Sequence, residues 1–472
     1  MKNNSDNVKA TFFIGIASFL TSGINYLTTP IFTRLISASE YGLISRYNSY
    51  YLIISVIATL TLSRPGILSV GLHEYKDNRW SYLSCMLGLI TVSSITVGSV
   101  FFFFWDFFSG ILNIPYSLAF LLFLSCLFIP ATTFWTYKQR YEYNWKGVCA
   151  VTIGTAILAQ AFSVCAVLWF KEYGNANLGI VRLYSANAIN LLVAVIIYIG
   201  IHLRGKNCVS LKLWKTTLFF ALPLIPHYLG FSLLNGLDKI MIGNMIGDDK
   251  AGIYSLASVI STVGLLVWQA LCVSVTPFMF KFLQTREYDV IRENIKPLLE
   301  VIGFCCIAIS FLAPEIILVF GTREYMEGIY VIPAVAAGTF MHVLYDLFAN
   351  AAFLKKKATY IMLSTIIAAL ANIILNFICI KRFGYISAGY TTYVSYVVLA
   401  LFHYKLYAYL EGQPLFAGIK ITFISVSILL MCVLPMLCYN DNFYRYVFLS
   451  LVSIIVFKRR KLYIDSIAKM KV

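Results

Sequence analysis

The sequence predicts an all-α membrane protein that crosses a bilayer many times, through about fourteen transmembrane helices. Of its 472 residues, 60% are hydrophobic and only 12% are charged, whereas soluble proteins carry roughly 25% charged residues. Long uncharged runs recur along the chain, and each reaches the roughly 20 residues that a helix needs to cross hydrocarbon. These runs do not alternate between polar and apolar residues, which argues against the strands of a membrane barrel.

The hydrophobic segments follow one another with short polar connections between them. We expect spans near residues 11–33, 43–70, 81–104, 117–137, 147–170, 179–203, 216–243, 253–280, 297–319, 331–354, 361–380, 388–409, 416–438 and 443–457. The first segment is too long for the core of a signal peptide, and no small-residue cleavage site follows it. It is therefore predicted to be a permanent helix. The last segment is weak, because only Tyr446–Phe457 separates Arg445 from Lys458.

Basic residues are distributed unequally between alternate connections. With the N-terminus in the cytoplasm, the predicted inside segments hold 25 Lys and Arg residues and the outside loops hold 7. Lys and Arg are retained on the cytoplasmic side during insertion, so we expect both termini in the cytoplasm. The net charge of +16 is spread over short clusters and forms no basic domain, which argues against a nucleic-acid partner.

Two stretches of similar pattern lie 210 residues apart, at Ile31–Ser45 and Met241–Ser255. In both, an apolar helix ends, a short polar turn follows, and a step containing Gly starts the next helix. The first copy joins helices 1 and 2, and the second joins helices 7 and 8, so both halves have the same orientation. This pattern indicates a parallel repeat, a common transporter plan. We expect one six-helix bundle at 1–209, a second at 210–412, and two further helices with a basic cytoplasmic tail at 413–472.

Two segments carry a family resemblance: TPIFTRLISASEYG at Thr29–Gly42 and LDKIMIGNMIGDDKAGIYSLA at Leu237–Ala257. They resemble segments of the polysaccharide transporters, the Wzx-type flippases of O-antigen and other lipid-linked oligosaccharides in bacteria. Their superfamily also includes the MATE multidrug exporters and the peptidoglycan lipid flippase. The resemblance implies two bundles that form a V in the bacterial inner membrane, with a cavity that opens alternately to each side. It also implies a polyprenyl-diphosphate-linked oligosaccharide as cargo, moved from the inner to the outer leaflet.

Several basic residues lie inside predicted membrane helices, where a charge at the centre costs at least about 2.5–3.5 kcal/mol unless it faces protein or water. Guanidinium groups bind phosphate through paired hydrogen bonds, so these residues are predicted to bind the anionic headgroup of the cargo. They are Arg64, Arg46, Arg182 and Lys239. Arg64 is the strongest candidate, because it lies deepest and precedes Pro65-Gly66, which would break the helix locally.

Structural interpretations of the same residues remain open. Arg46 and Arg182 lie near the outer ends of their predicted helices, where a long side chain can extend to the interface. Asp238 and Lys239 are adjacent and could instead belong to a structural ion pair. Arg64 could likewise serve only the local structure of its helix.

Acidic residues within helices, with a neighbouring histidine, are candidates for coupling transport to an ion gradient. These candidates are Asp346, His342 and Asp238. Asp346 and His342 are spaced i, i+4 and are predicted to share one face of helix 10. A carboxylic acid beside a histidine can carry a proton.

Other classes of function fit the pattern less well. A MATE-like ion-coupled multidrug exporter is the alternative, but cavities suited to cationic drugs would gain nothing from arginines inside the membrane. A membrane enzyme is not predicted, because the outside loops are short and no catalytic set, metal-ligand spacing or phosphate-binding loop is present. No cofactor or metal is expected. The expected partners are the lipid-linked oligosaccharide and membrane lipids, with polysaccharide assembly proteins as further candidates.

Overall fold

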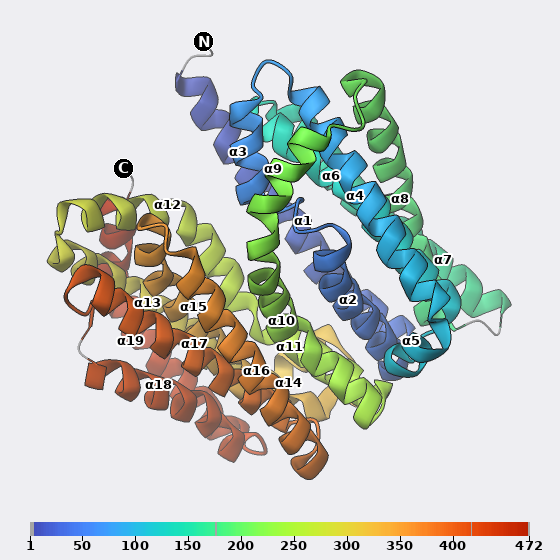
Figure 1. Cartoon of the computed structure of the whole chain (residues 1–472). Helices are drawn as coiled ribbons and strands as arrows, with labels where there is room; N and C mark the ends of the chain where they lie inside the picture. Colours follow the sequence, from blue (N-terminus) through green and yellow to red (C-terminus); the bar gives the residue numbers. More distant parts are fainter. Residues whose placement is uncertain (1–3, 175–176, 417, 471–472) are drawn as a thin grey trace. The chain divides into compact units, whose positions relative to one another are not determined.

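The computed structural model describes residues 4–174, 177–416 and 418–470. These residues form helices joined by short connections, and no strand occurs among them (Figure 1). The chain divides into two compact units, Met1–Gly236 and Leu237–Val472. The prediction of an all-α polytopic membrane protein is confirmed.

The first unit is built around helices α4, α6, α7 and α8. Its elements are α1 (Asn4–Leu35), α2 (Ala38–Ala58), α3 (Pro65–Glu74), α4 (Arg79–Phe103), α5 (Trp105–Leu112), α6 (Tyr116–Tyr141), α7 (Trp145–Tyr173), α8 (Leu178–Gly205), α9 (Leu211–Ala221), η1 (Leu222–Leu224) and the first part of α10 (Ile225–Met245). Helix α8 packs on α4, α6 and α7, and α1 packs on α7. A hydrophobic core joins α3, α4, α6 and α8 through Leu68, Met86, Phe134 and Ile201.

The second unit is built around the close pair α15 and α17. Its elements are the rest of α10, then α11 (Asp248–Ser261), α12 (Val263–Thr285), α13 (Tyr288–Phe311), α14 (Ala313–Phe320), η2 (Arg323–Tyr330), α15 (Ile332–Leu354), α16 (Ala358–Phe383), α17 (Ser387–Glu411), α18 (Gly418–Val433), η3 (Leu434–Cys438) and α19 (Asn442–Lys469). Small residues bring α15 and α17 together, as is usual between membrane helices. A Cβ added at Gly389 would lie 3.3 Å from the Cβ of Ala334.

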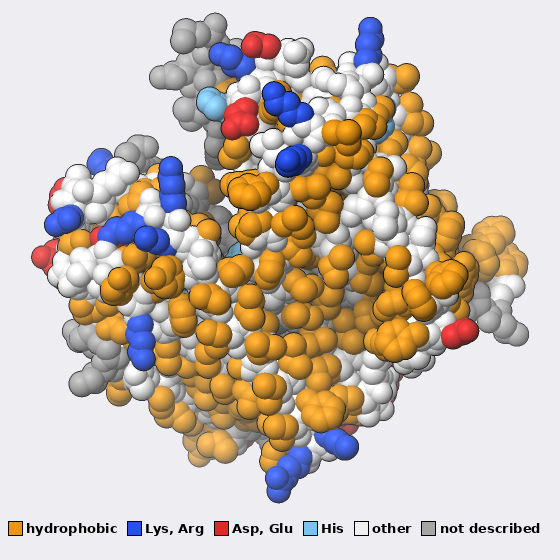
Figure 2. Space-filling view, viewed as in Figure 1, with side chains coloured by type: hydrophobic (Ala, Val, Ile, Leu, Met, Phe, Trp, Pro, Cys, Tyr) orange, Lys and Arg blue, Asp and Glu red, His pale blue; other side chains and the backbone are white. Residues whose placement is uncertain are grey.

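The surface of the protein is strongly apolar. Figure 2 shows hydrophobic side chains over wide areas of the visible face, and large side chains such as Phe103, Phe219 and Leu437 are 83% exposed. Exposed apolar surface of this extent is typical of a protein that contacts lipid. Ten helical segments among the described residues are long and apolar enough to cross a membrane. The length and composition of these segments confirm that the chain has many spans, but they do not establish the predicted count of fourteen.

Every predicted span corresponds to one helix or to consecutive helices. The largest difference is the segment 43–70, which was expected as one helix and is divided into α2 and α3. Similarly, 216–243 covers the second half of α9, η1 and most of α10, 253–280 covers most of α11 and of α12, and 297–319 covers the greater part of α13 and of α14. Hydropathy detects apolar runs of sufficient length, but it does not detect where the backbone bends within them.

The C-terminal helix α19 is attached to α13 and α14 by two ion pairs. The Arg445 guanidinium donates to both carboxylate oxygens of Glu315, at 2.9 and 2.6 Å. Nearer the other end, Arg459 and Glu300 lie 2.7 Å apart. Helix α19 runs unbroken over 28 residues, which is about 42 Å at 1.5 Å per residue, so the weak segment predicted at 443–457 is part of a much longer helix.

Candidate functional site

The break between α2 and α3 has an unusual backbone. Leu60 and Thr61 have φ values of 52° and 59°, so two consecutive non-glycine residues adopt the left-handed conformation. Each such residue costs roughly 1–2 kcal/mol, and strain of this kind is concentrated at functional sites. The Arg64 amide donates to the Thr61 carbonyl at 2.9 Å, and α3 then begins at Pro65. The turn fixes the direction in which Arg64 leaves the backbone.

The Arg64 side chain lies among aromatic residues of the first unit. Its guanidinium lies 4.8 Å from the ring centroid of Tyr228, a cation–π contact. The charge also lies within electrostatic range of Tyr51, Tyr137 and His227. Within the described part of the chain, Arg64 forms no ion pair. Its positive charge is therefore stabilised by rings and is not neutralised by a carboxylate.

The other two predicted arginines have different neighbours. Arg46 is 2% exposed, and its Nη2 donates to the Asn113 carbonyl at 3.1 Å. The Arg182 guanidinium lies 3.8 Å from the ring centroid of Phe32. The structure therefore does not bring Arg46 and Arg182 together with Arg64.

Asp238 and Lys239 belong to the second unit, where Asp238 is the centre of a polar cluster. Its carboxylate accepts hydrogen bonds from Tyr254 at 2.7 Å, Thr392 at 2.6 Å and Asn376 at 2.5 Å. These donors come from α11, α17 and α16, and Asp238 itself is 5% exposed. The three hydrogen bonds of Asp238 therefore come from neutral side chains. Lys239 is half-buried beside it.

His342 and Asp346 lie on one face of α15, as their spacing predicts. The His342 Nε2 and the Asp346 Oδ1 are 3.9 Å apart, which is too far for a hydrogen bond. Trp268 donates to the other carboxylate oxygen at 3.2 Å. The His342 ring stacks on Tyr396, with 4.9 Å between centroids.

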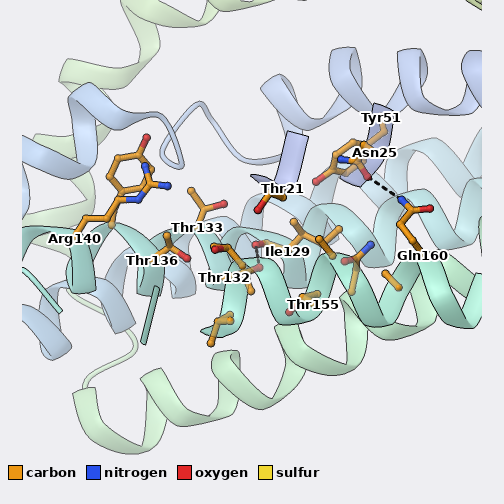
Figure 3. A pocket seen from close by; sticks show the side chains of 16 residues that line it. Thr21, Asn25, Tyr51, Ile129, Thr132, Thr133, Thr136, Arg140, Thr155 and Gln160 are labelled. Carbon is orange, nitrogen blue, oxygen red and sulfur yellow. Dashed lines mark hydrogen bonds between the residues drawn. The ribbon is translucent and has the colours of Figure 1, made fainter. Parts of the chain in front are cut away.

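Sequence reasoning missed a polar cavity of about 520 Å³ inside the first unit. Figure 3 shows that its labelled side chains come mainly from α1, α6 and α7, with Tyr51 contributed by α2. No predicted site residue lines this cavity, but Tyr51 and Tyr137 do, and both lie within range of the Arg64 charge. The sequence feature that could have indicated this cavity is the spacing of Thr132, Thr133 and Thr136 on α6.

Known proteins share this architecture. Residues 8–283 match the family described as "Polysaccharide biosynthesis protein". A protein of the Lsg locus of Haemophilus influenzae is 23% identical over 377 residues, which cover 77% of this chain and 89% of that protein. Among solved structures, the lipid II flippase MurJ in an inward closed conformation has a TM-score of 0.63 at 16% identity, covering 97% of this chain and 99% of MurJ.

A second solved structure, an inward-facing MATE family transporter of the MOP superfamily, has a TM-score of 0.58 at 12% identity. The alignment covers 86% of this chain and 95% of the MATE protein. Similarity at these identities shows a shared fold. The family match covers more than half of the chain, and it confirms the resemblance seen in the two quoted segments. The chain belongs to the polysaccharide biosynthesis protein family, and it shares its fold with the lipid II flippase MurJ and the MATE family transporter.

Proposed function

We propose that the protein is a flippase that moves a polyprenyl-diphosphate-linked oligosaccharide, such as an O-antigen unit, from the inner to the outer leaflet of the bacterial cytoplasmic membrane. Membership of the polysaccharide biosynthesis family and the fold shared with the lipid II flippase MurJ support a lipid-linked cargo. In this proposal both termini lie in the cytoplasm, the two halves form a parallel repeat, and transport proceeds by alternating access.

The placement of Arg64 is the observation that carries the proposal. Its guanidinium lies at a break between helices in an apolar protein, with the Tyr228 ring beside it. Stacking against a ring leaves the N–H edge of a guanidinium available for bidentate binding of a phosphate. Because no described carboxylate pairs with Arg64, the charge remains available to a diphosphate headgroup. Arg46, Arg182 and Lys239 are proposed as further contacts of the anionic headgroup, and Arg46 and Arg182 would meet it at other points of its path than Arg64 because they have different neighbours.

Ion coupling is proposed to act in the second unit, at Asp238 first and at the Asp346–His342 pair second. The hydrogen bonds of Asp238 come from neutral donors, so the buried carboxylate keeps a net charge that a proton or cation could neutralise. The Asp346 side chain is 38% exposed, so its charge is less isolated from water. Polysaccharide assembly proteins are proposed as additional partners at the membrane surface.

The test is complementation in a strain whose surface polysaccharide depends on this gene. After deletion, we expect oligosaccharide-linked polyprenyl diphosphate to accumulate on the cytoplasmic leaflet, and wild type to clear it. Arg64→Ala removes charge-assisted hydrogen bonds worth about 1.5–3 kcal/mol, so transport should fall about 10- to 150-fold. Arg382→Ala, which removes an exposed guanidinium at the end of α16, is the matched control and should complement fully.

The outcomes of this test distinguish a flippase from a multidrug exporter. Accumulation that wild type clears and a stably inserted Arg64→Ala does not clear supports the flippase and the role of Arg64. Normal surface polysaccharide and no accumulation after deletion would refute the flippase. The MATE-like multidrug exporter, the alternative class, would then be tested by drug sensitivity of the same strain.

A further inference from the structure

Most residues that line the cavity in the first unit are polar and none is negatively charged, although apolar atoms form most of the cavity wall. Sixteen residues line it, and they include six threonines, three side-chain amides and two tyrosines. Arg140 is its charged residue, and none of the lining residues is acidic. A volume of about 520 Å³ is within the range of small-molecule sites. The cavity therefore suits an uncharged or anionic polar ligand better than a cation.

The polar side chains form stripes on three helices. On α6, Thr132, Thr136 and Arg140 follow one another at intervals of four residues, so they share one helix face over about two turns. Helix α1 contributes Thr21 and Asn25, and α7 contributes threonines at the same spacing. Figure 3 shows Arg140 at one end of the cavity, the Asn25–Gln160 pair at the other, and threonines between them.

The cavity contains hydrogen-bonding capacity that the protein does not use. Three threonine hydroxyls donate to carbonyls of their own helix, with their remaining lone pairs unused: Thr21, Thr132 and Thr152. Three others make no hydrogen bond to the described residues: Thr133, Thr136 and Thr155. Polar groups left unpaired in an apolar protein are unfavourable unless water or a ligand satisfies them.

Arg140 lies at one end of the cavity, and not all of its N–H groups have a hydrogen-bond acceptor. Its Nη2 donates to the Ser18 hydroxyl at 3.1 Å, and its guanidinium lies 5.6 Å from the ring centroid of Tyr137. Its Nε is buried without an acceptor among the described residues. Arg140 has no carboxylate partner in this part of the chain, so it can bind an oxyanion.

We propose that this cavity is a glycan subsite, in which sugar hydroxyls hydrogen-bond to the threonines and amides and Arg140 binds an adjoining oxyanion. The inference rests on the proposed flippase function and deepens it. Sugar hydroxyls both donate and accept, as do the threonine hydroxyls and the Asn25 and Gln160 amides. The oxyanion belongs either to the diphosphate or to an acidic sugar.

The test compares two lipids on the purified full-length protein in detergent. One is undecaprenyl diphosphate, and the other is the same lipid carrying the oligosaccharide, extracted from the deletion strain. Wild type should bind the glycosylated lipid at least about tenfold more tightly, equivalent to about 1.4 kcal/mol. The triple variant Thr132→Val, Thr133→Val, Thr136→Val keeps side-chain volume, removes three hydroxyls, and should reduce the ratio of the two affinities to about one.

Controls distinguish the possible failures. The corresponding triple Ser variant retains the hydroxyls and should keep the wild-type ratio, and so should Thr96→Val on the exposed face of α4. If the triple Val variant is unstable, Thr136→Val alone should lower the ratio severalfold. Equal binding of both lipids by wild type, or an unchanged ratio in stable Val variants, would overturn the glycan subsite and leave the flippase standing. Absence of any lipid accumulation or binding would remove the flippase as well.

Arg140→Gln identifies the source of the oxyanion. If Arg140 binds the diphosphate, this variant weakens binding of both lipids. If Arg140 binds an acidic sugar, only the glycosylated lipid loses affinity. No effect on either lipid would overturn the assignment of Arg140.

Discussion

Removal of the carboxylate that pairs with Arg445 should be among the most destabilising changes in the second unit. The Arg445 side chain is 2% exposed and that of Glu315 is 35% exposed. Glu315→Gln removes the negative charge and one of the two acceptor oxygens, so the buried guanidinium keeps only neutral acceptors: the new amide oxygen, the Asn442 oxygen and the Phe311 carbonyl. Breaking a buried ion pair costs about 3–5 kcal/mol, mostly because the remaining charge stays buried.

Removal of the arginine should lower the free energy of unfolding by less than removal of the carboxylate. Arg445→Met leaves Glu315 partly exposed to solvent, with the Tyr446 hydroxyl still donating at 2.6 Å. Because water can replace part of the lost interaction, we expect Arg445→Met to destabilise the protein by about 2–3 kcal/mol. The double variant Arg445→Met, Glu315→Gln leaves no isolated charge, so its destabilisation should be smaller than the sum of the two single changes.

Thermal unfolding in detergent, followed by tryptophan fluorescence, measures these differences. For a unit of this size, each kcal/mol shifts Tm by about 2–4 °C, so Glu315→Gln should lower Tm by about 6–20 °C. Asp289→Asn breaks an ion pair in which Asp289 is 87% exposed, and it should shift Tm by no more than about 4 °C. The reasoning is refuted if Glu315→Gln shifts Tm no more than Asp289→Asn, or if the two single effects simply add.

Three further changes test other parts of the structure. Asp238→Asn preserves the size of the side chain but removes one of its acceptor oxygens. It should reduce transport at least about tenfold and lower the free energy of unfolding by about 1–3 kcal/mol. Full transport by this variant would contradict the coupling role of Asp238. Hydrogen bonds from Lys250 and Tyr385 hold the pKa of Glu327 below its ordinary value of 4.5. That stabilisation should be present above pH 4.5 and be lost as pH falls through the lower folded pKa, so Glu327→Gln should flatten the dependence of Tm on pH between 3 and 7. Glu40 accepts from the amides of Ser37 at 2.9 Å and Leu178 at 2.6 Å, which caps α2 and α8, and Glu40→Ala should lower stability by about 1–2 kcal/mol in the same assay.

Much of the helical architecture could be predicted from the sequence. Apolar runs of membrane length must form helices, because hydrocarbon offers no partners for free backbone groups. The break at Leu60 and Thr61 was placed only approximately, through Pro65-Gly66, because neither residue normally favours a left-handed backbone. Hydropathy gives no information about that turn.

The polar sites were only partly predictable. Asp238 was visible as a charge inside a helix, but its donors Asn376 and Thr392 are separated from it by 138 and 154 residues. Their proximity depends on helix packing, which a single sequence does not specify. The threonines of the first unit were missed for a different reason, because isolated hydroxyl residues are common in membrane helices, where they bond to their own backbone.

The pairing of Arg445 with Glu315 also has a consequence for biosynthesis. The two residues are separated by 130 positions, so at 5–20 residues per second the ribosome needs roughly 6–26 s to deliver the guanidinium after the carboxylate. During that time α14 has been synthesised and its ion-pair partner does not yet exist. Glu300 waits still longer for Arg459. A chain that ends between α14 and α19 therefore carries two carboxylates, those of Glu300 and Glu315, without their arginine partners.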